Sequence, residues 1–457
     1  MDKEYKGGIF YQGVANTLTI QKNIILGLML FALFLGAGNI IFPPALGQGA
    51  GENLFISMIG FLIAAVGLPL LAVLAIANSN NGEEGGLQTI ASRVHPAFGI
   101  VFTMIIYMAI GPFFGIPRTA TVSYEIGIMP FLSNGISEAW WPLALFTFLF
   151  FTITVILALN PAKLVDRIGK LLTPVLFIVI GALVLKSFLT PMGSIQDAQG
   201  DYLTHPFFHS FVEGYLTMDV IAALVFGIII INALKAEGVT KKGPVMKAMI
   251  IAGIIAAAGL TFVYVSLSYI GATSVEAIGL QDNGGAILAL TSTVLYGSAG
   301  TTILAITIIF ACLTTSIGLV SACAQYFEEV FPRFSYRTYV FIFAGFSAVI
   351  GNFGLTQLIA ISLPILMMIY PLAIVLMLMS FIDRFFGRKP IVYIIALSAT
   401  AIVSIFDGLK VAGIEVKPML SLLSHLPLYE QQIGWLVPAI LGALIGVLLN
   451  LFMPKHN

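Results

Sequence analysis

The chain has 457 residues, of which 59% are hydrophobic and only 9% are charged. Because a soluble globular domain carries about 25% charged residues, this composition excludes a soluble protein and indicates a chain that lies in a lipid bilayer. Lys and Arg together number 21, as do Asp and Glu, so no excess of charge points to nucleic acid as a partner. The two cysteines, Cys312 and Cys323, match no zinc or redox spacing and are predicted to be small apolar core residues.

Residues 1–23 are predicted to form a cytoplasmic N-terminal segment, because they carry several charges and precede the first apolar run. That run begins at Ile24. It is too long for the apolar core of a signal peptide, and no small-residue cleavage site follows it. We therefore expect it to remain in the protein as the first membrane span.

Twelve apolar stretches are each long enough, or nearly so, to cross a bilayer as a helix of ~20 residues, so we predict an all-α integral membrane protein. The boundaries of the third, ninth and tenth spans are the least distinct. The apolar pattern of the third runs on past Pro117, and only Gly351–Leu355 separates the ninth from the tenth. The stretch Gly284–Tyr296 is too short for a span and is predicted to be a helix that lies on or dips into the outer face. The predicted spans are 24–43, 53–77, 97–116, 142–160, 171–190, 209–233, 246–271, 298–325, 338–352, 356–382, 390–406 and 434–452.

The distribution of Lys and Arg supports an even number of spans. When the N-terminus is placed in the cytoplasm and successive loops alternate in side, all Lys and Arg residues except Arg118, Lys186, Lys410 and Lys417 fall on the cytoplasmic side. Cytoplasmic loops of membrane proteins carry such an excess of basic residues. Both termini are therefore predicted to be cytoplasmic.

Two of the predicted spans carry helix-breaking residues in their middle. In the first span, Gly36, Gly38 and Asn39 are poor helix formers and Pro43 lacks a backbone donor, so we expect the outer half to be unwound. In the sixth span, the polar segment Glu213–Asp219 precedes an apolar run, and an acidic side chain within a span is a candidate functional group. Close helix packing is the alternative explanation for any single glycine.

Interrupted first and sixth spans are typical of a fold built from two inverted five-helix repeats. Span one begins near residue 24 and span six near residue 209. We therefore predict a first repeat over 24–190, a second over 209–382 and two additional helices over 390–452. No sequence similarity between the halves is visible, so this prediction rests on hydropathy and on the positions of the breaks.

Three segments resemble signature motifs of the bacterial branched-chain amino acid carriers of the BrnQ/BraB type. They are Gly27–Pro44, Ile110–Glu125 and Glu213–Asp219. Members of that family are understood as cation-coupled symporters of leucine, isoleucine and valine with a LeuT-like fold. The resemblance therefore implies this fold, a branched-chain amino acid as substrate, and a place in the bacterial cytoplasmic membrane. It implies no obligatory protein partner.

A second, more distant similarity implies a sodium site. The spacing of Ala311, Thr314 and Thr315 is similar to that of a sodium site in symporters of the LeuT fold, where a backbone carbonyl and two hydroxyls meet carbonyls of the broken first helix. By position, those carbonyls belong here to Ala32 and Leu35. Neutral oxygens suit a hard cation such as Na⁺. The alternatives are that both hydroxyls bond only to their own helix, and that the coupling ion is H⁺.

An amino acid is a zwitterion with an apolar tail, and each part needs its own partner. The carboxylate suits the free N–H groups after Gly36, where the helix dipole is positive. The ammonium suits carbonyls near Leu33–Leu35 and Tyr215–Thr217. One methylene is worth only ~1–3 kcal/mol in an apolar pocket, so leucine, isoleucine and valine should all be accepted. The predicted substrate-binding residues are Phe34, Gly36, Ala37, Gly38, Asn39, Tyr215, Leu216, Thr217 and Asp219.

Three side chains near the breaks have more than one interpretation. For Asp219 the interpretations are an ion pair with the substrate ammonium, tuning of the ion site, transport of a proton, and capping of its half-helix. Arg118 gates the site, pairs with Glu125, or reaches the outer lipid headgroups, of which the last is favoured. Asn39 offers its amide oxygen to an ion or substrate, or simply ends the helix.

Two other function classes receive little support. A membrane enzyme would need a catalytic cluster at membrane depth, yet the five histidines lie in loops or at span ends, and neither a His-Glu-x-x-His pattern nor a Walker-type loop occurs. An ion channel would need a filter-like repeat or a ring of charge. We therefore expect a carrier and not an enzyme. A proton-coupled carrier of other apolar amino acids remains the main alternative.

Overall fold

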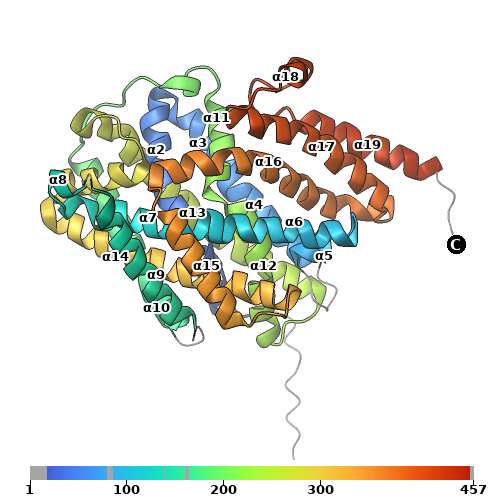
Figure 1. Ribbon diagram of the computed structural model, residues 1–457, viewed down its shortest axis with the longest axis horizontal. Helices are drawn as coiled ribbons and strands as arrows, with labels where there is room; N and C mark the ends of the chain where they lie inside the picture. The colour runs from blue at the N-terminus through green and yellow to red at the C-terminus, as the bar shows by residue number, and fades with distance from the viewer. Residues whose placement is uncertain (1–17, 80–85, 138, 160–163, 453–457) are drawn as a thin grey trace, which may run out of the picture.

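The computed structural model describes residues 18–79, 86–137, 139–159 and 164–452, and every regular element in these ranges is a helix (Figure 1). Most of the predicted N-terminal segment lies outside the described residues. Within the described ranges, seven apolar stretches are long enough to cross a membrane, an eighth consists of two helices that meet at a 43° bend, and four are shorter apolar helices. They follow the order of the twelve predicted spans, so the predicted all-α, multi-span fold is confirmed.

The first span is broken. It consists of α1 (Ile20–Phe34) and α2 (Ala37–Ala50), separated by Leu35 and Gly36. In a continuous helix the Gly36 N–H would donate to the Ala32 carbonyl, but it donates instead to Phe34 O (2.7 Å) and to Asn39 Oδ1 (3.0 Å). The predicted interruption is confirmed, and it releases the Ala32 carbonyl from its helical partner.

The extent of that break differs from the prediction. Gly38 and Asn39 were expected in unwound backbone, but both lie within α2, which continues past Pro43 to Ala50. Only two residues are needed to interrupt the helix. The Asn39 side chain, at the third helical position, then caps the new N-terminus through Gly36 N–H, as the corresponding residue does in a capping box.

The sixth span is broken as predicted. It consists of α11 (Pro206–Glu213), the 3₁₀ turn η6 (Gly214–Thr217) and α12 (Asp219–Ala236). Met218 separates η6 from α12 with a left-handed backbone (φ 62°, ψ 16°), a conformation that non-glycine residues adopt infrequently. The result is a bend in the middle of an apolar segment.

The third span continues past Pro117, in agreement with its apolar pattern. It consists of α6 (Pro96–Met108), the π-helical turn η3 (Ala109–Phe113) and α7 (Gly115–Gly127). Gly111 has a non-helical ψ of −120° directly before Pro112, which accounts for the kink between α6 and α7. Because α7 extends to Gly127, Arg118 lies within a helix and not in an outer loop.

The remaining long helices match the other predicted spans. They are α3 (Leu54–Leu62) with η2 (Ile63–Gly67) and α4 (Leu68–Ser79), α9 (Trp140–Ala158), α10 (Leu164–Leu189), α13 (Lys242–Ile278), α14 (Gly284–Val330), α15 (Tyr336–Gly351), α16 (Leu355–Ile382), α17 (Pro390–Val411) and α19 (Leu436–Phe452). Short elements connect them: η1 (Gly51–Asn53), α5 (Leu87–Ala91), η4 (Met129–Phe131), α8 (Asn134–Ser137), η5 (Gly200–Tyr202), η7 (Asp383–Phe386) and α18 (Lys417–Leu423).

The predicted short helix Gly284–Tyr296 is the first arm of α14. Gly297, with φ 64°, separates this arm from the long remainder of the helix. The arm packs directly on α2, because a Cβ on Gly284 would lie 1.7 Å from the Ile41 carbonyl oxygen. Its helical state is confirmed, and its place relative to the membrane stays a prediction.

The two broken spans lie next to each other in the interior. The second half of the first span, α2, contacts α7, α13 and α14, and the second half of the sixth, α12, contacts α4 and α16. α2 also contacts η6 directly. α17 packs against α16, and α19 packs against α17, on one side of the molecule, as the two predicted additional helices (Figure 1). Cys312 and Cys323 are buried and unpaired, as expected for core residues. The fold thus surrounds both breaks with other helices.

Candidate functional site

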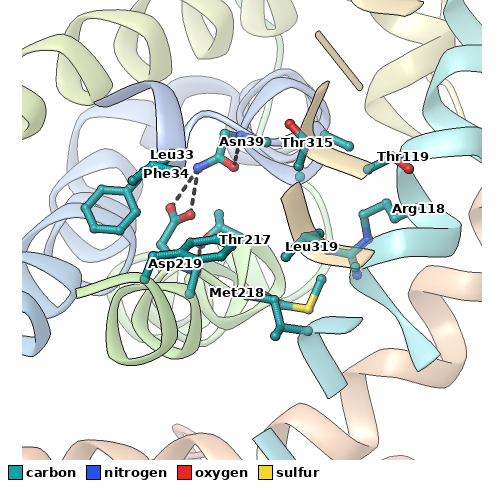
Figure 2. A pocket seen from close by; sticks show the side chains of 17 residues that line it. Leu33, Phe34, Asn39, Arg118, Thr119, Thr217, Met218, Asp219, Thr315 and Leu319 are labelled. Atoms are coloured by element: carbon teal, nitrogen blue, oxygen red, sulfur yellow. Dashed lines mark hydrogen bonds between the residues drawn. The ribbon is translucent and has the colours of Figure 1, made fainter. Parts of the chain in front are cut away.

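Both breaks border one cavity (Figure 2). The lining comes from the α1–α2 break, from η6 and α12, and from α7 and α14. The sequence-predicted residues that line it are Phe34, Gly36, Ala37, Gly38, Asn39, Thr217, Asp219 and Thr315.

Asp219 and Asn39 are the centre of a buried hydrogen-bond network. Asn39 Nδ2 donates to Asp219 Oδ1 (2.9 Å) and Oδ2 (2.8 Å), and the Tyr264 hydroxyl donates to Oδ2 (2.7 Å). Asn39 Nδ2 and the Tyr264 hydroxyl also contact each other. Asp219 and Asn39 are each 1% exposed. The network therefore fixes the carboxylate at the edge of the cavity with neutral partners only.

The structure distinguishes among the interpretations of these two residues. Asp219 does not cap α12, because Met218 occupies the cap position and the carboxylate reaches α2 and α13 instead. Asn39 does not end its helix, and its amide oxygen accepts from Gly36 N–H. Its amide nitrogen must consequently face Asp219. Asn39 thus connects the break of the first span to the carboxylate of the sixth.

Arg118 is buried in α7 at the cavity and does not reach the outer headgroups, which corrects the favoured prediction. It is 1% exposed, because the third span continues beyond it instead of ending there. Its Nη1 donates to the carbonyl of Leu216 (2.5 Å) and its Nη2 to Ser362 Oγ (3.1 Å). Glu125 is not its partner and accepts from Asn283 Nδ2 (3.3 Å).

Of the five predicted sodium residues, Thr315 lines the cavity, whereas Ala32, Leu35, Ala311 and Thr314 are not among its lining residues. Thr315 lines the cavity and its Cγ2 lies 3.7 Å from the position that a Cβ on Gly36 would take. The hydroxyls of Thr314 and Thr315 both donate to the Ala311 carbonyl, at 2.8 and 3.0 Å. These are the bonds expected if the threonines serve only their own helix, although each hydroxyl oxygen retains lone pairs. The sodium site stays a prediction.

Tyr215 and Leu216 do not line the cavity, but they contact Tyr370 and Arg118 next to it. The Tyr215 ring stacks on Tyr370 at a centroid distance of 4.5 Å, and the Leu216 carbonyl accepts from Arg118. The hydroxyl of Tyr370 in turn accepts from Val220 N–H (3.2 Å). These contacts stabilise the backbone around η6.

Several cavity or network residues were not predicted from the sequence. Tyr264 and Phe226 lie in apolar runs without any local signal, since a membrane tyrosine is usually a packing or interface residue. Met218 was adjacent to a singled-out residue, but its left-handed backbone has no signature in its side chain. Arg118 was singled out, with a gate at the site as one interpretation, but the headgroups were favoured because the third span was expected to end at residue 116.

The comparisons with known proteins agree with this architecture. The family model "Branched-chain amino acid transport protein" matches residues 19–453. The "Branched-chain amino acid permease BraB" of Bacillus subtilis (strain 168) is 50% identical over 439 residues, covering 96% of this chain and 97% of the relative. The "Branched-chain amino acid transport system 2 carrier protein" of Pseudomonas aeruginosa is 41% identical over 432 residues, covering 94% of this chain and 97% of the relative.

Solved transporter structures share the fold. Mhp1, a nucleobase-cation-symport-1 family transporter in a closed conformation, aligns with a TM-score of 0.62 at 13% identity, over 93% of this chain and 91% of the other. MhsT in complex with L-phenylalanine aligns with a TM-score of 0.56 at 14% identity, over 95% and 98%. The predicted LeuT-like architecture is confirmed. From its near-complete match to the family model and its identity to these carriers, the chain belongs to the branched-chain amino acid transport protein family.

Proposed function

We propose that the chain imports leucine, isoleucine and valine across the bacterial cytoplasmic membrane by symport with Na⁺, through alternating access. The observation that carries this proposal is that residues of both helix breaks line the same cavity. Such breaks let backbone groups bind solute and cation at membrane depth. The relatives are named as permeases or carriers of branched-chain amino acids, which supports the substrate class.

An aliphatic tail fits the apolar part of the lining. Phe34, Ile110, Phe226 and Leu319 border the cavity together with Ala222. A pocket of such side chains distinguishes aliphatic tails that differ by one methylene only weakly, by ~1–3 kcal/mol. It rejects polar side chains strongly, because their polar groups would be buried without partners. We therefore propose one site for all three branched-chain amino acids.

The cation is proposed to bind between the first break and α14. The Ala32 and Leu35 carbonyls on one side, and the Ala311 carbonyl with the Thr314 and Thr315 hydroxyls on the other, are neutral oxygens of the kind that Na⁺ accepts. Thr315 lies near Gly36, within the break itself. Entry of one positive charge across 100 mV contributes ~2.3 kcal/mol to accumulation.

Proton coupling is the second candidate, and Asp219 favours it. This carboxylate is buried at the cavity beside a helix break, where a proton would change both its charge and its bonds to Asn39 and Tyr264. A protonated carboxyl would neutralise the site without any bound metal ion. Asp219 would then carry the coupled ion.

Reconstitution separates these candidates. The full chain is incorporated into proteoliposomes, and uptake of radiolabelled leucine is measured with an inward Na⁺ gradient alone and with an inward proton gradient alone. Accumulation with Na⁺ alone supports the proposal, and accumulation with protons alone supports the second candidate. If leucine passes no faster than through protein-free liposomes under either gradient, both are refuted.

A further inference from the structure

The cavity carries two buried charges of opposite sign that do not contact each other. Asp219 and Arg118 both line it, and each is 1% exposed. Figure 2 shows the carboxylate and the guanidinium on opposite sides of the cavity. Among the described residues, the hydrogen-bond partners of both are neutral: Asn39 and Tyr264 for the acid, Leu216 and Ser362 for the base.

Buried charges without counter-ions are unfavourable, because partial charges of neutral groups replace only part of the lost hydration. Two such charges at opposite ends of one cavity match a ligand that has an opposite pair of its own. A zwitterion neutralises both at once, whereas a simple anion or cation neutralises one. The cavity is therefore complementary to an amino acid in charge.

Arg118 has donors left for an anion. A guanidinium has five N–H groups, of which one on Nη1 and one on Nη2 serve Leu216 and Ser362. Its Nε is fully buried and has no hydrogen-bond partner among the described residues. Buried donors of charged groups are rarely left in this state unless a ligand, an ion or an ordered water completes them.

The N-terminus of α2 adds a second source of positive potential at the same place. The first amides of a helix have no partner within it, and the helix dipole is positive there. Arg118 lies directly against this turn, since its Nη1 is 3.3 Å from the position that a Cβ on Gly38 would take. Asn39 Oδ1 is already bonded to Gly36 N–H and does not compete for these donors.

We propose that Arg118, together with the first turn of α2, binds the carboxylate of the transported amino acid, and that Asp219 with its network binds the ammonium. This inference rests on the proposed function and names the residue that recognises one end of the substrate. An alternative role for Arg118 is purely structural: it holds the Leu216 carbonyl and so maintains the break in the sixth span.

Paired changes in protein and ligand separate the two roles. Binding of L-leucine, leucinol and 2-hydroxy-4-methylpentanoate to the full-length protein in lipid nanodiscs is measured by calorimetry. Leucinol lacks the carboxylate and the hydroxy acid lacks the ammonium. The variants are Arg118→Gln and Asp219→Asn, with Arg93→Gln as the control, since Arg93 is another largely buried arginine, paired with Asp383 away from the cavity.

A charge-assisted hydrogen bond is worth about 10- to 100-fold in affinity. We expect Arg118→Gln to lower the affinity for leucine and for the hydroxy acid by this factor, and the affinity for leucinol by less than about threefold. Asp219→Asn should lower the affinity for leucine and leucinol but leave the affinity for the hydroxy acid unchanged. Arg93→Gln should leave the ratio of leucine to leucinol affinity at its wild-type value.

Equal losses for leucine and leucinol in Arg118→Gln would assign Arg118 the structural role and overturn the inference, as would unchanged leucine affinity. If Arg118→Gln does not fold, Arg118→Lys keeps the charge without the planar fork. This variant should lower the ratio of leucine affinity to leucinol affinity, and an unchanged ratio would overturn the inference. A wild-type protein that binds none of these ligands refutes the proposed function itself, which distinguishes the two failures.

Discussion

Asn39 and Asp219 are 180 positions apart in the chain, yet the amide of one donates to both carboxylate oxygens of the other, at 2.9 and 2.8 Å. One residue follows the break in the first span and the other follows the break in the sixth. A change at either break therefore reaches the other through two hydrogen bonds. Ligand binding that moves one helix break would therefore act on the other break through these two hydrogen bonds.

Replacing Asp219 with asparagine should strongly reduce transport without unfolding the protein. The oxygen of the new amide still accepts from Asn39, so we expect a stability loss of about 1 kcal/mol, measured as thermal unfolding in detergent. Leucine uptake into proteoliposomes should fall at least about tenfold, because a charge-assisted bond is lost. Uptake within twofold of the wild type would show that the carboxylate takes no part in transport.

Replacing Thr315 with alanine should weaken the dependence of leucine uptake on Na⁺. The Na⁺ concentration for half-maximal uptake should rise about tenfold or more, because one proposed ligand is removed. Thr307→Ala is the matched control, since Thr307 lies on the same helix, is buried, bonds to its own helix (Ile303 O, 2.8 Å), and does not line the cavity. The same Na⁺ dependence in both variants would contradict the sodium assignment.

Replacing Gly47 with alanine should destabilise the contact between α2 and α13. A Cβ at Gly47 would lie 2.0 Å from the Ser268 carbonyl oxygen, so the backbones must separate, at about 1–3 kcal/mol or more. Gly318→Ala is the control, because a Cβ at this helical glycine meets no atom within 4 Å. That variant should gain about 0.5–1 kcal/mol in stability. A comparison of the two melting temperatures in detergent tests this; equal shifts would refute the packing role.

Replacing Asp383 with asparagine should destabilise the protein by about 3–5 kcal/mol, because arginines would lose their buried counter-charge. Asp383 is 1% exposed and accepts from Arg93 (2.5 Å), while Arg388 Nε lies 3.4 Å away. Glu237→Gln removes an exposed ion pair with Lys22 and should cost about 1 kcal/mol or less. If chemical unfolding shows equal losses for both variants, the buried cluster has no special role.

Reporter fusions test the predicted topology. A fluorescent protein that folds only in the cytoplasm should be bright at either terminus, and alkaline phosphatase, which needs the periplasm, should be inactive there. The expectation follows from the segregation of Lys and Arg between alternate loops. Periplasmic activity at either end would require a different span count or orientation.

The sequence alone predicted the fold class, the order of the spans and the place of both breaks. It could do so because the bilayer demands local solutions: every span must be apolar and must satisfy its own backbone hydrogen bonds. Residues that disturb a helix, such as Gly36 and Gly214, are therefore conspicuous within an apolar run. Local chemistry also marked Asp219, since a carboxylate within a span is costly and needs a reason.

Only the tertiary structure decided which groups meet. It placed the Tyr264 hydroxyl on the Asp219 carboxylate, and Arg118 at the cavity instead of at the headgroups. It also confined the first break to Leu35 and Gly36, because the Asn39 side chain caps the helix that follows. Contacts between residues that lie far apart in the chain depend on helix packing and side-chain direction, and neither leaves a periodic trace in the sequence.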